Sequence, residues 1–130
     1  MANEVNGPTI SVTLGATVAA VNTLIKMSSA GVGILTTGVA SEDNTLVGAA
    51  METGVSGDVI AVRVFNCVAS SKVKMAGAVT KGAGVFTAAS GLGSATATSL
   101  TRVGIAMEAA TAANDIIQVL HVAGGNDDLT

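Results

Sequence analysis

One short sequence occurs twice in this chain of 130 residues. The segment TLVGAAMETGVSGD (residues 45–58) has a partner in TRVGIAMEAATAAND (residues 101–115), and six of the first eight positions are identical. A further block, GVGILTT (residues 31–37), matches GAGVFTA (residues 82–88). Two copies are too few for a solenoid, which needs about three or more repeats. The pattern therefore predicts two similar β units packed together.

The repeat suggests how the chain is divided. We expect an N-terminal arm over residues 1–8, a single β domain over residues 9–123, and an acidic C-terminal tail over residues 124–130. Within the domain, residues 31–64 and 82–122 are predicted to form the internal repeat. A chain of this length agrees with one domain, since it buries roughly two thirds of its unfolded surface on folding.

Runs of β-branched residues between clusters of Gly, Ser and Asn indicate strands of ordinary length. The predicted strands cover residues 9–14, 21–27, 45–51, 58–65, 71–77, 84–89, 101–107 and 115–122. Residues 14–25 also fit one helix face, but we interpret residues 21–27 as a strand, and residues 90–99 as a loop. The predicted fold is mainly β: a small antiparallel β-barrel or sandwich of two similar strand-loop-strand units, with room for one short helix.

Glycine and aspartate occupy matching positions in the two copies. Gly48 and Gly104 lie in the middle of equivalent predicted strands, which indicates a bulge or a close approach of two backbones. Asp58 and Asp115 each precede a predicted strand, where an aspartate side chain caps a turn through nearby backbone groups. The loops that end at these aspartates are therefore expected to bring each strand back antiparallel.

Composition restricts both the core and the class of partner. The chain has no Trp, no Tyr and two Phe, so we expect thin aliphatic layers rather than a deep aromatic pocket. The net charge of −3, from six Lys and Arg against nine Asp and Glu, offers no basic surface for nucleic acid or an anionic membrane. The chain has no run of about 20 apolar residues and no signal-peptide pattern at its start, which predicts a protein made in a cytoplasm.

Residues suited to catalysis or metal binding are scarce. His121 is the single histidine and is expected to be structural, and Cys67, the single cysteine, is expected to be a small buried thiol. One chain therefore offers neither a zinc site nor a Cys–His dyad. Glu52 and Glu108 recur at strand ends, where we interpret them as solvated charges within reach of cations such as Arg63; a paired-carboxylate site is the alternative. No catalytic, cofactor-binding or metal-binding residue is predicted.

Two further motifs are similar to known binding sites but lack the residue that the chemistry needs. GAVTKGAG (residues 77–84) has no Gly-Lys followed by Ser or Thr, which a phosphate-binding loop requires. GAAMET (residues 48–53) and GIAMEA (residues 104–109) resemble the hairpin on which biotinyl and lipoyl domains present a lysine. Here a glutamate follows the methionine in both copies, so no such group can be attached.

Three features within residues 44–122 match the pattern of a known family. They are a Gly-Ile-Ala-Met-Glu-Ala strand (residues 104–109), a Val-rich strand after it (residues 115–122), and a Lys-Gly-x-x-Val-Phe step (residues 81–86). In these features the chain resembles the phage capsid cement, or head decoration, family, formerly a domain of unknown function and sometimes mislabelled as a phage recombinase. The family usually has Gly-Asp in the middle step, whereas this chain has Gly-Ala.

The resemblance implies a structural protein of the virion, without catalysis and without a cofactor. It implies binding to the outer capsid surface, with the major capsid protein as partner, often as a homotrimer, and no contact with nucleic acid or membrane. The expected shell or subunit contacts are Glu4, Asn6, Pro8, Glu52 and Glu108. Two alternatives stay open: another virion component, such as a tail tube or fibre subunit, and a small enzyme or carrier module that uses the two repeated glutamates.

Overall fold

The computed structural model describes residues 9–37, 46–64, 70–96 and 102–121, whose strands form two antiparallel sheets. The first sheet contains β1 (Thr9–Thr13), β2 (Leu24–Met27), β3 (Gly33–Leu35), β4 (Leu46–Ala50) and β5 (Val59–Val64). The second contains β6 (Ser70–Lys74), β7 (Gly84–Thr87), β8 (Gly93–Ser94), β9 (Arg102–Ala106) and β10 (Ile116–His121). In the described residues the one helical segment is a short 3-10 turn, η1 (Ala89–Gly91). The predicted mainly β class is confirmed.

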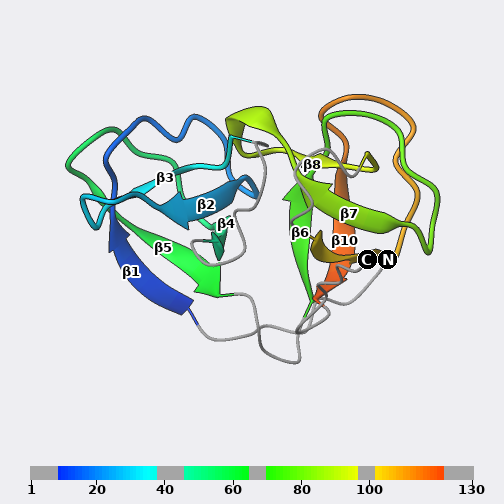
Figure 1. Cartoon of the computed structure of the whole chain (residues 1–130), viewed down its shortest axis with the longest axis horizontal. Helices are drawn as coiled ribbons and strands as arrows, with labels where there is room; N and C mark the ends of the chain where they lie inside the picture. Colours follow the sequence, from blue (N-terminus) through cyan, green and yellow to red (C-terminus); the bar gives the residue numbers. More distant parts are fainter. Residues whose placement is uncertain (1–8, 38–45, 65–69, 97–101, 122–130) are drawn as a thin grey trace.

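The two sheets have the same topology. Their strand orders are β1-β5-β4-β2-β3 and β6-β10-β9-β7-β8, so each strand of one sheet has a counterpart in the other. We call β1–β5 the first unit and β6–β10 the second unit, and Figure 1 shows them side by side along the longest axis. Neither sheet closes into a barrel, so the sandwich is the correct one of the two predicted architectures.

The topology corrects one part of the predicted repeat. Residues 82–88 contain β7, whose counterpart is β2, whereas residues 31–37 contain β3, whose counterpart is β8. The match between these two blocks is therefore wrong, because similar Gly-rich sequences occur in two strands that occupy different positions in the strand order. The blocks that carry the Met-Glu pairs are equivalent, since they begin with β4 and β9.

The predicted arm and tail, residues 1–8 and 124–130, lie outside the described residues.

All eight strands predicted from the sequence are present, with ends that differ by up to three residues. The ambiguous segment of residues 21–27 contains a strand, β2, as we expect. The sequence does not predict β3 or β8, and the interpretation of residues 90–99 as a loop is wrong at β8 and η1. Both missed strands are two or three residues long and contain glycine, which leaves too few residues for an alternating pattern.

Turns of the two units share a left-handed backbone conformation. Gly57 (φ 96°) and Asn114 (φ 72°) precede β5 and β10, and Asn22 (φ 65°) and Gly82 (φ 90°) precede β2 and β7. Glycine and asparagine adopt positive φ at the lowest cost, which explains why they interchange at these positions. The N–H groups of Asn22 and Gly82 also make equivalent 2.7 Å hydrogen bonds to the last residues of β4 and β9.

Each unit has its own apolar core, and the two cores match residue for residue. The core of the first unit consists of Val12, Leu14, Val18, Ile25, Ala50, Ile60 and Val62. Their counterparts in the second unit, in the same order, are Val73, Met75, Val79, Val85, Ala106, Ile117 and Val119. All are aliphatic side chains of modest size, so the strands that carry them pack closely, as the composition predicts.

Gly48 and Gly104 mark a close approach of two backbones in each unit. A Cβ on Gly48 would overlap the carbonyl oxygen of Arg63, and a Cβ on Gly104 would overlap that of Leu120. The ladders between β2 and β4 and between β7 and β9 also shift register beside these glycines. Of the two alternatives that the sequence indicates, the close approach is therefore present in both units, and an irregularity of the ladder accompanies it.

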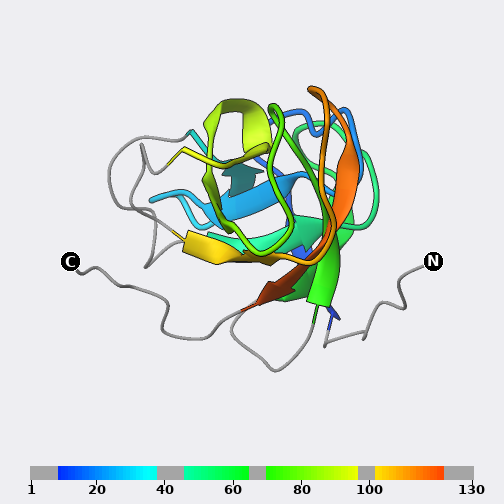
Figure 2. The same cartoon turned by 90° about the vertical axis from the view of Figure 1, so that its right-hand side faces the viewer.

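The outer face of the first sheet makes the contact between the units. Leu24 and Ala49, a cross-strand pair of β2 and β4, are buried and join the core of the second unit. The Lys74 N–H donates to the Asn22 carbonyl (2.9 Å), and the Thr36 hydroxyl donates to the carbonyl that precedes η1 (2.9 Å). In Figure 2 the second unit faces the viewer and the first unit lies behind it. The first unit thus closes one side of the second unit's core.

Candidate functional site

The repeated glutamates bind backbone at equivalent places in the two units. Glu52 Oε1 accepts a hydrogen bond from the Ala61 N–H (3.0 Å), and Glu108 Oε2 accepts one from the Gln118 N–H (3.1 Å). In both units the N–H of the preceding methionine donates to the carbonyl of that same strand residue (2.9 Å). Each carboxylate therefore replaces the backbone carbonyl that would continue the ladder beyond β4 or β9.

This hydrogen bond gives the glutamates a structural role that the sequence analysis does not assign to them. The prediction that they lie at strand ends is correct, and Glu52 is exposed while Glu108 is half-buried. Arg63, however, is buried rather than extended into solvent. A signal was present in the sequence: the strand residue that donates lies nine positions after Glu52 and ten after Glu108, at matching places in the repeat.

The structure does not bring Glu52 and Glu108 together. Each bonds within its own hairpin, and Figure 1 shows the loop of residues 51–58 and that of residues 107–115 at opposite ends of the longest axis. One chain therefore does not form the paired carboxylates of the enzyme alternative. Among the described side chains, no three His, Cys, Asp or Glu residues gather where they could hold a metal ion.

Asp58 and Asp115 cap turns, as predicted. Asp58 Oδ2 accepts from the Val55 N–H (2.9 Å), and Asp115 Oδ2 accepts from the N–H groups of Thr111 (2.9 Å) and Ala112 (3.2 Å). The backbone bond from Thr111, then that from Ala112, and the weaker bond from the Thr111 hydroxyl lower the pKa of Asp115 below its ordinary value of 3.8. The loop before β5 and the loop before β10 are therefore each held by their own carboxylates.

Beside these loops each unit exposes an apolar pair. Met51 (39 % exposed) and Val59 (61 %) form it in the first unit, and Met107 (39 %) and Ile116 (44 %) occupy the equivalent positions in the second. We call these pairs the hairpin surfaces. Single exposed apolar residues are ordinary, but exposure at equivalent positions of both units is a repeated surface feature. The sequence analysis does not select these four residues, although the Met positions recur in the repeated segment.

Family models and curated proteins give no relative of this chain. No protein-family model matches the chain, and no curated protein matches it. In the part of the chain that the structure describes, no helix is long and apolar enough to span a bilayer. Function is therefore inferred from the residues and their geometry.

Several residues singled out in the sequence fall outside what can be placed. Glu4, Asn6, Pro8 and Cys67 lie outside the described residues, so their predicted roles stay predictions. The backbone of His121 ends β10, and Ile117 and Val119 of the same strand are buried. The role predicted for the His121 side chain stays a prediction.

Proposed function

We propose that this chain is a structural virion protein that binds the outer surface of a bacteriophage capsid and stabilises the shell. The observation that carries the proposal is the pair of matched hairpin surfaces, one in each unit. A protein that reinforces a lattice binds a repeated target, and two equivalent contacts on one rigid chain suit such a target. The resemblance of residues 44–122 to the capsid cement family supports the same role.

The positions of the hairpin surfaces favour simultaneous contact. The loops beside them, residues 51–58 and 107–115, lie at the two ends of the long axis in Figure 1. Two separated contacts on one chain can bind neighbouring sites of a shell at the same time. Linked weak contacts then give an avidity that exceeds either contact alone.

The hydrogen bonds of the hairpins support the same proposal. Glu52 and Glu108 tie the beginning of each loop to the facing strand, and Asp58 and Asp115 tie its end. Because these loops are held before any partner binds, the entropy lost on binding is smaller than for unrestrained loops. On the lattice we propose a homotrimer, with the major capsid protein as partner.

Co-sedimentation with expanded capsids tests the proposal. Wild-type protein is expected to sediment with the shells and to raise the temperature at which they release DNA. Met51→Asp and Met107→Asp are each expected to lower occupancy roughly 10- to 100-fold, because one of two linked contacts is lost. The double variant is expected to show no binding.

Val21→Asp is the matched control. Val21 is 38 % exposed, and its counterpart in the second unit is Lys81, so a charge at this position fits the fold. This variant should bind shells as the wild type does. Equal occupancy of the wild type and the double variant, or no wild-type protein with the shells, contradicts the proposal. Electron microscopy of gold-labelled particles adds an independent readout, since label on the tail would favour a tail component.

A further inference from the structure

The outer faces of the two sheets are equivalent, but among the described residues only that of the first unit is covered by the other unit. In the first unit this face carries Leu24 and Ala49, both buried against the second unit. In the second unit the same positions carry Gly84 and Ile105, both half-buried, and Leu120 beside them is 38 % exposed. Within the described part of the chain, the second unit therefore leaves partly exposed the face that the first unit uses for contact.

The residues of this face preserve an apolar contact surface. The cross-strand pair is Leu24 with Ala49 in the first unit and Gly84 with Ile105 in the second. Each pair contains one large aliphatic residue and one small one, with their places exchanged between the strands. A large aliphatic side chain at this pair is expected on a face that another surface buries. A face that stays in solvent has no need of one.

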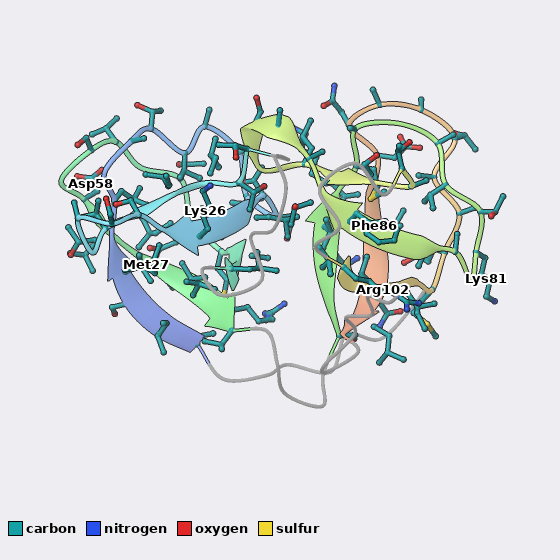
Figure 3. The ribbon with its side chains drawn as sticks, in the orientation of Figure 1. Lys26, Met27, Asp58, Lys81, Phe86 and Arg102 are labelled. Atoms are coloured by element: carbon teal, nitrogen blue, oxygen red, sulfur yellow. The ribbon has the colours of Figure 1, made fainter. Side chains whose placement is uncertain are left out.

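An aromatic ring and a guanidinium complete the uncovered face. The Phe86 ring and Arg102 Nε both lie within 3.5 Å of the place that a Cβ on Gly84 would take, and Figure 3 shows the two side chains next to each other on the second unit. Arg102 Nε is buried and has no hydrogen-bond acceptor among the described residues. Phe and Arg are enriched in protein interfaces. We call Gly84, Phe86, Arg102, Ile105 and Leu120 the second-unit face.

The first unit carries the complementary edge. Within the chain, the β6 residue Lys74 donates its N–H to Asn22, at the start of the covered face. The counterpart of Lys74 is Thr13, on the sheet-edge strand β1. The Leu14 N–H points toward β5, where it donates to the Asp58 carbonyl (2.8 Å), so the Thr13 N–H points away from β5. On that side Leu14 is bridged to Gly33, as Met75 is to Gly93 in the second unit, where the Lys74 N–H still donates to Asn22. Gly82, the counterpart of Asn22, is exposed beside the second-unit face.

We propose that the second-unit face of one copy binds the β1 edge of a second copy of this chain, head to tail. The Thr13 N–H of one copy then donates to the Gly82 carbonyl of the next, as Lys74 does to Asn22 within a chain. A head-to-tail contact produces a closed ring or an open filament, according to the rotation between copies. The inference goes beyond the capsid proposal and does not depend on it, because the contact forms in solution without a shell.

Sedimentation velocity over a range of protein concentrations tests the contact. Wild-type protein is expected to form species of several times the 12.6 kDa monomer mass as its concentration rises. Leu120→Asp with Ile105→Asp removes the apolar contact on one side and should give a monomer. Thr13→Pro removes the N–H on the other side and should also give a monomer. Because that N–H points away from β5 and proline is tolerated on edge strands, β1 should persist in this variant.

Mixing the two monomeric variants separates the head-to-tail contact from a symmetric one. The first variant keeps its β1 edge and the second keeps its face, so an equimolar mixture should give a single species of twice the monomer mass and nothing larger. A symmetric face-to-face contact predicts instead that Thr13→Pro, which keeps its face, associates with itself in the absence of the first variant. Failure of the mixture to associate, with both variants folded by circular dichroism, would overturn the proposal.

Matched controls and one measurement on the wild type complete the test. Thr13→Val keeps the N–H and should associate as the wild type does, and so should Val55→Asp, since Val55 is 55 % exposed and belongs neither to the second-unit face nor to β1. Independently of any variant, the Thr13 amide should exchange with deuterium at least 10-fold more slowly at high concentration than at low concentration. A wild-type monomer up to roughly 1 mM, the weak end of specific association, contradicts the inference.

Discussion

The two units of this protein have the same core but different outer faces. Seven buried positions of the first unit have aliphatic counterparts in the second, and the left-handed turns and the capping carboxylates recur at matching positions. On the outer face the pattern changes: Leu24 is buried where the second unit has Gly84, and Arg63 is buried where it has the exposed Leu120. Core positions are restricted by packing in both units, while outer positions depend on what covers each face.

The largest expected effect tests whether the units share their backbone packing. Gly48→Ala and Gly104→Ala should each destabilise the protein by about 3 kcal/mol or more, because the new Cβ meets a backbone carbonyl that cannot rotate away. Chemical denaturation of both variants measures the loss. Gly77→Ala, where a Cβ meets nothing within 4 Å, is the control and should be neutral or slightly stabilising. A small loss at only one of the two glycines would show that the units pack differently.

A smaller effect tests the asymmetry between the faces. Leu24→Ala should cost about 2–4 kcal/mol, since this side chain is fully buried against the second unit. Thermal and urea unfolding, monitored in dilute solution, measure the change. Val55→Ala removes a similar aliphatic group from a side chain that is 55 % exposed, and should change stability by less than about 0.5 kcal/mol. Equal losses for the two variants would mean that the first unit does not close the second core.

The next effect distinguishes a structural glutamate from a contact glutamate. Glu52→Ala and Glu108→Ala should each lose about 1 kcal/mol and leave the amides of Ala61 and Gln118 to exchange faster with deuterium. The conservative variants Glu52→Gln and Glu108→Gln keep an acceptor oxygen and should retain most of the protection. Unchanged amide exchange in the alanine variants would assign the glutamates to another role, such as shell contact.

The smallest effect concerns pH. Hydrogen bonds to the charged form lower the folded-state pKa of Asp115, so its stabilising contribution is complete above the ordinary pKa of 3.8 and is lost as pH falls through the lower folded-state value. Asp115→Asn should therefore lower the melting temperature near neutral pH, and the difference from the wild type should shrink on acidification. Melting curves from about pH 7 to about pH 2 measure this dependence. A constant difference across that range would contradict the assignment.

Local patterns predicted much of the fold and part of the candidate site. The eight longer strands follow from β-branched runs between turn residues, and the close approach at Gly48 and Gly104 follows from glycine at matching strand positions. The turns capped by Asp58 and Asp115 depend on groups three or four residues away. The aliphatic core follows from composition. Each of these features depends on neighbours in the sequence, so a single sequence contains the information.

The remaining features depend on residues that are distant in the sequence. Strands as short as β3 and β8 are stabilised by the sheet they join, and the true equivalence of β2 with β7 appears only from strand order. The backbone partner of each repeated glutamate lies across a hairpin. Burial of Leu24 but not of its counterpart arises from the packing of one unit on the other. The sequence by itself determined two β units with similar cores, whereas the tertiary structure decided which face of each is covered, because burial depends on the neighbour that packs there.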